Sequence, residues 1–233
     1  MKTLLLATAF FVTSLHATED WKKSRPVSGF TGLSVSSGID LYLTQGSSEK
    51  LLFDVKGVDE EDVRSEIKNG VLKLYVERSG MTWGFNFGKS KYVKAYVTFK
   101  QLSSLSASGG ADVFGEGNLS FNDLNMSVSG GSDLTMNLKA NDLNVSVSGG
   151  ADAVLEGSAK TLNASSSGGA DLDARKLTAS VCTANASGGA DVYVKATQEL
   201  TMKASGGSDI YYYGSAKVVA KSKSGGSDIT QKD

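Results

Sequence analysis

The stretch Ser108-Gly109-Gly110-Ala111-Asp112 recurs along the second half of the chain, with Ala or Ser in the fourth position. The further copies end at Asp133, Asp152, Asp171, Asp191, Asp209 and Asp228. Successive aspartates of the motif lie 18 to 21 residues apart. A nearly constant period of about 20 residues is typical of a solenoid, in which each repeat is one turn stacked on the last. A repeat of this size cannot bury a core alone, which excludes an array of independent units.

Apolar residues alternate with other residues on both sides of the motif. The residue after the aspartate is always apolar, and it reads Val113, Leu134, Ala153, Leu172, Val192, Ile210 and Ile229. Before the motif, apolar columns alternate with polar columns that we expect to face solvent and to bond one another as ladders, such as Asn125, Asn144 and Asn163. This period of two predicts short strands joined by the motif, where Gly allows the positive φ of a tight corner. The sequence therefore predicts an all-β fold, a single-stranded right-handed parallel β-helix with turns of about 20 residues.

The chain is expected to have one domain behind a signal peptide. Residues 1–17 combine Lys2 with an apolar run that is too short to span a membrane, which predicts a secretory signal. Residues 18–29 are predicted as a linker and residues 30–233 as one β-helix domain. Within it, irregular first turns are expected over 30–105, with a degenerate motif at Ser37 to Asp40 and a short helical turn at Val58 to Ile67. Regular turns follow over 106–233, and no segment predicts a membrane span.

Composition excludes several classes of function. The only histidine, His16, lies in the predicted signal, and the only cysteine, Cys182, falls in a column of buried leucines and permits no internal disulfide. No nucleophile with a base, zinc cluster or phosphate loop can be assembled from the remaining residues. Without the signal the formal net charge is 23 − 25 = −2, which is too balanced to indicate a nucleic-acid partner. We therefore expect no enzyme.

The aspartate column has two interpretations. In the first, the carboxylate accepts backbone N–H groups from the glycine corner of its own or the adjacent turn, at each of Asp112, Asp133, Asp152, Asp171, Asp191, Asp209 and Asp228. In the second, the stacked carboxylates form a row of calcium sites, helped by Ser hydroxyls and corner carbonyls. No cofactor is expected under the first interpretation, and calcium is the cofactor of the second.

Aromatic residues supply the second group of candidate site residues. Trp83, Phe85 and Phe87 stand in a segment without a clear turn assignment, where they either pack on the end of the solenoid or stack on a ligand. In Tyr211-Tyr212-Tyr213, alternation directs Tyr211 and Tyr213 outward and Tyr212 inward. Packing is again the alternative to ligand contact for the outward pair.

The signal, the degenerate Ser-Ser-Gly-Ile-Asp and the run of Ser-Gly-Gly-Ala/Ser-Asp corners together resemble a known family. It comprises exported bacterial β-helix proteins and is called the putative auto-transporter adhesin head, or GIN, domain. The resemblance covers about residues 28–230. It implies a right-handed β-helix exposed in the periplasm or at the cell surface, and it transfers no catalytic residue.

These observations favour a non-enzymatic, exported binding or structural protein of the cell envelope, with adhesin-like contact to a glycan or to an envelope or host protein. One alternative is a β-helix polysaccharide lyase or hydrolase, which would need a cleft with clustered Asp and Lys or Arg. Another is a calcium-stabilised scaffold. The expected location is the periplasm, the outer-membrane surface or the medium, and the sequence does not predict an oligomeric state.

Overall fold

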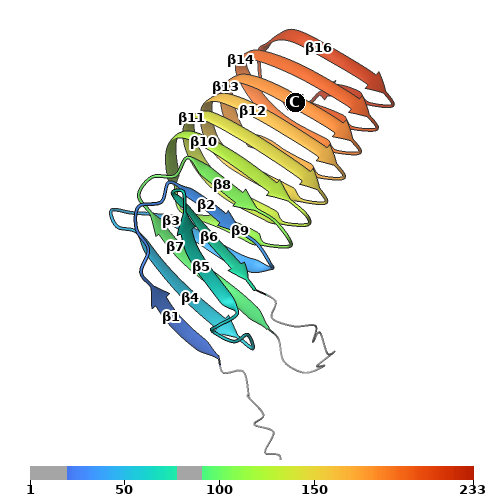
Figure 1. Cartoon of the computed structure of the whole chain (residues 1–233). Helices are drawn as coiled ribbons and strands as arrows, with labels where there is room; N and C mark the ends of the chain where they lie inside the picture. Colours follow the sequence, from blue (N-terminus) through green and yellow to red (C-terminus); the bar gives the residue numbers. More distant parts are fainter. Residues whose placement is uncertain (1–19, 78–90) are drawn as a thin grey trace, which may run out of the picture.

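The computed structural model of the chain describes residues 20–77 and 91–233. In these residues it contains only β-strands and the turns that join them (Figure 1). Parallel strands stack as a solenoid of about seven turns that are roughly 19 residues apart, so the predicted all-β solenoid is confirmed. None of the described residues forms a helix long and apolar enough to cross a membrane.

In the regular turns, one long strand bends and runs along more than one side of the solenoid. The four strands of this kind are β11 (Asp133–Gly149), β12 (Asp152–Gly168), β13 (Asp171–Gly188) and β14 (Asp191–Gly206). We call the side on which they begin the Asp face, which also contains β9 (Asp112–Glu116), β15 (Asp209–Tyr213) and β17 (Asp228–Gln231). We call the side on which they end the Asn face, which also contains β8 (Ser104–Ala107), the end of β10 (Leu119–Ser129) and β16 (Lys217–Gly225).

The core lies between the two faces. In β11, Leu134, Met136 and Leu138 point inward from the Asp face, and Val145 and Val147 point inward from the Asn face. The same columns are buried in the neighbouring turns, and in-register parallel pairing keeps like residues stacked. Cys182 is buried in a column of leucines, as predicted.

The motif corner and a second corner separate the Asp face from the Asn face, and in β12 and β13 the alternation also breaks at Gly157-Ser158 and Arg175-Lys176. At the motif, the fourth residue is fully buried in the corner, as Ala151 and Ser208 show, which explains the restriction to Ala and Ser. The second corner has no glycine motif and was not predicted. There the alternation breaks, because Asn141 and Asp142 are both exposed between the buried Ala140 and Leu143.

The N-terminal end extends both faces, but not in chain order. The Asp face continues through β3 (Ile39–Gln45), β7 (Tyr92–Phe99), β4 (Lys50–Lys56) and β1 (Trp21–Arg25). The Asn face continues through β2 (Gly32–Val35), β6 (Val71–Val76) and β5 (Val63–Lys68). Strands β1, β4 and β5 pair antiparallel with their neighbours, and β1 and β5 form the two edges at this end, opposite β16 (Figure 1).

The short helical turn expected at Val58 to Ile67 is wrong. Residues 60–62 form a turn and β5 begins at Val63. Strand β5 pairs with β6 across Asn69 and Gly70, both of which have positive φ, as a tight hairpin turn requires. Within β5 only Val63 is buried, whereas Ile67 is exposed.

Candidate functional site

The motif aspartates form one row on the Asp face. Strand registers pair Asp133 with Asp152, Asp152 with Asp171, and so on to Asp228. The Oδ1 atoms of Asp152 and Asp171 each accept the backbone N–H of the next aspartate of the row, over 3.3 Å. Asp209 does the same for Asp228 over 3.0 Å. The three donors are backbone N–H groups of aspartates at the motif corner of the adjacent turn.

Stacking carboxylates in this way has an electrostatic cost. The pKa of Asp133 is raised, first because burial removes water from the carboxylate and then because Asp112 and Asp152 carry like charge. Asp191 has a raised pKa for the same reasons, with Asp171 and Asp209 as its neighbours. The row ends differently. Lys223 donates to Asp228 over 2.9 Å and lowers the pKa of that carboxyl.

The carboxylates lie along a line and do not surround a point. Within residues 20–77 and 91–233, no group of three or more His, Cys, Asp or Glu side chains is placed to hold a metal ion. The calcium sites considered for the aspartate row therefore stay a prediction that rests on the sequence.

An aromatic row runs beside the aspartate row, two residues further along each strand. Tyr96, Tyr42 and Phe114 are register neighbours on β7, β3 and β9. The ring of Tyr42 stacks on Tyr96 with centroids 4.9 Å apart and on Phe114 with centroids 5.2 Å apart. Strands β14 and β15 continue the row with Tyr193 and Tyr211, which stack at 4.8 Å.

Cations of the chain itself cover these rings. The Arg175 guanidinium lies 4.2 Å from the Tyr193 centroid, while its Nε lies 2.8 Å from Asp173 Oδ1. The Lys232 ammonium lies 5.1 Å from the Tyr211 centroid. Each pair combines a cation with the negative face of an aromatic ring.

Between the two aromatic stretches the row continues with smaller side chains. The register neighbours after Phe114 are Thr135 on β11 and Val154 on β12. Phe114 and Val154 are each 38% exposed. We call Phe114, Thr135 and Val154 the Phe114 patch. It lies between the aspartate row on one side and Glu116 and Glu156 on the other.

The predicted aromatic contacts are only partly described. Tyr211 belongs to the row, and its hydroxyl donates to Asp209 Oδ2 over 3.1 Å. Tyr213 is partly exposed beside Lys195, and Tyr212 packs against the core. Trp83, Phe85 and Phe87 lie outside the described residues.

Sequence reasoning missed most of the aromatic row. Phe114 and Tyr193 stand two residues after a motif aspartate, so their column was visible in the repeat. Tyr42 and Tyr96 come from the irregular part of the chain, where the strands stack out of order. The row therefore became recognisable only from the strand registers.

The opposite side of the solenoid carries a polar ladder. On the Asn face, Asn163 Nδ2 donates to Asn144 Oδ1 over 2.8 Å, and Asn144 Nδ2 donates to Asn125 Oδ1 over 3.0 Å. Near the motif corner, a shallow groove of about 310 Å³ is lined mainly by serines, together with Asn185 and Lys203. This face offers hydroxyl and amide groups, but no aromatic side chain lines its groove.

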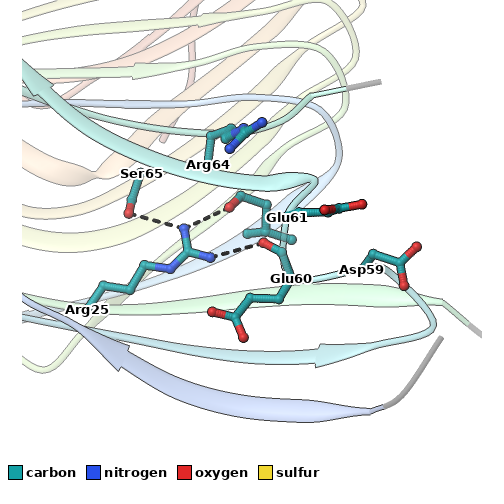
Figure 2. Close-up of a pocket in the computed structure, with 7 residues that line it drawn as sticks. Arg25, Asp59, Glu60, Glu61, Arg64 and Ser65 are labelled. Atoms are coloured by element: carbon teal, nitrogen blue, oxygen red, sulfur yellow. Dashed lines mark hydrogen bonds between the residues drawn. The ribbon is translucent and has the colours of Figure 1, made fainter. Parts of the chain in front are cut away.

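A further depression lies at the N-terminal end, next to β1 and β5. Figure 2 shows Arg25, Asp59, Glu60, Glu61, Arg64 and Ser65 at this cavity of about 910 Å³. Arg25 Nη1 donates to Val63 O over 2.7 Å and to Ser65 Oγ over 3.3 Å, and Nη2 donates to Glu60 O over 3.2 Å (Figure 2). Desolvation lowers the pKa of Arg25, which remains a cation because its usual value is so high. These bonds fasten the 59–62 turn to the end of the solenoid, which is a structural role.

Nucleophilic chemistry has no support in the described residues. Burial raises the pKa of the Cys182 thiol to about 12, so it is not a thiolate at neutral pH. Asp173 and Arg175 form a partly exposed ion pair on an open strand surface, and Lys176 pairs with Glu156 beside it. Neither pair lines one of the depressions described above.

Comparison with known proteins gives a family and a fold. The family described as "Putative auto-transporter adhesin, head GIN domain" matches residues 29–216. No curated protein matches the sequence significantly. Among solved structures, a putative adhesin from Bacteroides fragilis is similar with a TM-score of 0.83 and 24% identity, over 92% of this chain and 97% of that one.

Two further structures share the fold at lower identity. A putative adhesin from Parabacteroides merdae has a TM-score of 0.75 at 17% identity, and a putative lipid binding protein from Parabacteroides distasonis has 0.70 at 18%. Each comparison covers 92% of this chain and 97% of the other. At these identities the likeness concerns the fold alone.

Proposed function

This chain belongs to the putative auto-transporter adhesin, head GIN domain family, and from that membership we propose that it is a non-enzymatic, exported binding protein of the cell envelope. Its partner is held on the Asp face of the solenoid. The predicted signal at residues 1–17 supports export, and the adhesin names of the family and of two structural relatives support a contact function.

The aromatic row on the Asp face is the observation that carries this proposal. The solenoid needs inward apolar columns to fold, but it does not need outward ones. Phe114 and Val154 nevertheless expose apolar surface, and Tyr42, Tyr193 and Tyr211 of the same row are partly exposed. Aromatic side chains of this kind supply large, rigid contact area at protein interfaces.

The experiment is a binding screen with matched variants. The protein is applied to arrays of glycans and of immobilised envelope and host proteins, alongside Phe114→Ser and, on the opposite side, Asn144→Ser. We expect Phe114→Ser to weaken retention by about tenfold or more, since a central aromatic contact is commonly worth at least that much. Asn144→Ser is expected to bind like the unchanged protein.

Two outcomes contradict the proposal. If no glycan or protein is retained, the chain has no binding role of this kind. If Asn144→Ser loses binding and Phe114→Ser keeps it, the partner lies on the Asn face. Trp83→Ala in the same screen tests the sequence-based prediction that Trp83, Phe85 and Phe87 also contact the ligand.

A further inference from the structure

Phe114 is the last ring of its stack. One face of the ring packs on Tyr42, with centroids 5.2 Å apart. On the other side, the register neighbour is Thr135, which is too small to cover an aromatic ring. The 38% exposure of Phe114 is consistent with a ring face left open to solvent on that side.

Tyr211 occupies the equivalent position further along the same row. It too is the last ring of a stack, and its register neighbour in the next turn is also a threonine, Thr230. Two residues beyond Thr230, Lys232 places its ammonium 5.1 Å from the Tyr211 centroid. The chain thus closes this ring with a cation of its own.

At Phe114 the corresponding position holds a neutral residue. Two residues beyond Thr135 stands Asn137, which is exposed. Of the cation–ring contacts in the described chain, none involves Phe114. The aromatic face that the chain covers with Lys232 at Tyr211 is therefore left for another molecule at Phe114.

The charge around the Phe114 patch indicates what that molecule carries. Asp112, Asp133 and Asp152 line one side, and no ion pair within residues 20–77 and 91–233 involves any of them. On the other side Glu156 is paired with Lys176, whereas Glu116 only accepts a hydrogen bond from Thr44. The pKa of Asp133 is raised first by burial and only then by the like charges of Asp112 and Asp152. A neutral sugar could cover the ring but would leave the charge uncompensated.

We propose that the Phe114 patch binds a lysine- or arginine-rich segment of a partner protein, with a cationic side chain over the Phe114 ring and its charge beside Asp133 and Asp152. This rests on the proposed binding role of the Asp face and names the chemistry of its partner. The alkyl stem of the incoming side chain covers Thr135 and Val154, and the cationic head reaches the carboxylates. Arg175 shows the same combination of ring and carboxylate within the chain, since it contacts Tyr193 and Asp173 together.

Binding of labelled peptides to the full chain tests this directly. The probes are an oligolysine, an oligoarginine and an oligoglutamate peptide, measured by fluorescence anisotropy at several salt concentrations, with a neutral chito-oligosaccharide as competitor. The decisive variant is Asn137→Lys, which supplies the missing cation from the chain itself. Its control is Asn141→Lys, the same change on the same strand at the second corner. A second pair is Asp133→Asn and its control Asp142→Asn, which also lie on one strand.

We expect the basic peptides to bind and the acidic peptide not to bind. Asn137→Lys and Asp133→Asn should each lower the affinity for the basic peptides by about tenfold. The two control variants should lower it by less than about twofold. Asp133→Asn keeps an oxygen that accepts the next N–H, so the fold is retained, which the melting midpoint checks. If variant and control lose affinity equally, the attraction is only diffuse charge and the proposal is overturned. If the chito-oligosaccharide displaces the peptides from the unchanged protein and binds it more tightly, the patch is a glycan site and the proposal is overturned.

The peptide experiment and the array screen together distinguish a wrong partner chemistry from a wrong binding role. If the basic peptides fail while the array screen yields a ligand that depends on Phe114, the partner chemistry is wrong and the Asp face still binds. If both experiments yield nothing, the binding role falls as well.

Discussion

At the scale of single residues, the later copies of the motif depend on the first glycine more than on the second: from Gly149 onward only the first glycine has positive φ, whereas both glycines do in Gly109-Gly110 and Gly130-Gly131. Gly206 has a φ of +79°, and a Cβ added there would lie 2.8 Å from the Gly188 carbonyl oxygen of the preceding turn. Gly207, the second glycine of the same motif, has no such φ, and its added Cβ would lie 3.7 Å from that oxygen. The first glycine is thus required both by the corner and by the close stacking of turns.

Replacing the first glycine should be far more harmful than replacing the second. We expect Gly206→Ala to lower the free energy of unfolding by about 2 kcal/mol or more, through left-handed backbone strain and the displaced carbonyl. Gly207→Ala should change it by less than about 1 kcal/mol, because an ordinary φ carries no such strain. Urea unfolding of the two variants measures this. Equal losses would show that the corner does not depend on φ at the first position.

The raised pKa of Asp133 predicts how the stability of the fold depends on pH. A carboxyl whose pKa is higher in the folded state destabilises the fold when it is ionised, and this penalty disappears as the pH falls through that raised pKa. Asp133→Asn should therefore increase stability at pH 7 by up to about 0.8 kcal/mol for each neighbouring charge, at low salt. The gain should vanish below about pH 3.9, where the unfolded carboxyl is also protonated.

Asp228 is the control with the opposite sign. Lys223 lowers the pKa of Asp228, so its ionised form stabilises the fold above the unfolded pKa, and that contribution is lost as the pH falls through the lowered pKa. Asp228→Asn should consequently reduce stability at pH 7. Chemical denaturation across pH 3 to 8 compares the two variants. A destabilised Asp133→Asn at neutral pH would show that the aspartate row is not under electrostatic strain.

At the scale of strands, the Asn face is joined by side chains as well as by the backbone. Asn144 donates to Asn125 and accepts from Asn163, so it takes part in both described bonds of the ladder. We expect Asn144→Ala to lower the free energy of unfolding by about 1 kcal/mol. This is the low end of the range for two lost hydrogen bonds, because the ladder is accessible to solvent. Ser146→Ala, at the next outward position of β11, should be close to neutral. Equal effects in thermal unfolding would contradict a stabilising ladder.

The strands also show which features of the fold could be predicted from the sequence. The motif and its flanking alternation were enough to predict parallel strands in register, because each column repeats seven times from Asp112 to Asp228. The second corner was missed because Asn141 and Asp142 turn the chain without glycine. The stacking of Tyr42 between Tyr96 and Phe114 could not be predicted, because β3 pairs with a later strand on each side.

At the scale of the whole molecule, the open question is whether the aspartate row serves the fold alone or also binds metal. The carboxylates are drawn out along the solenoid, and described members of the row already accept N–H groups of the next turn. We therefore expect the same melting midpoint with excess calcium and with chelator. A midpoint that rises by several degrees with calcium would restore the calcium-stabilised scaffold, since a ligand that binds only the folded state raises stability.

The Asp face and the Asn face differ in chemistry, and we assign contact to the Asp face. Hydroxyl and amide ladders cover the Asn face, whereas carboxylates and aromatic rings cover the Asp face. An extended partner could cross several turns of the Asp face, because the same columns continue from one turn to the next.

Carboxyl footprinting by mass spectrometry tests this assignment most directly. The protein is labelled at its aspartates and glutamates alone and in complex with the ligand that ranks first in the array screen. The account predicts that Asp112, Asp133 and Asp152 become protected, while Asp123 and Asp142 at the second corner stay equally reactive. Protection of Asp123 and Asp142, with Asp133 and Asp152 unchanged, would contradict the claim that the Asp face is the binding surface.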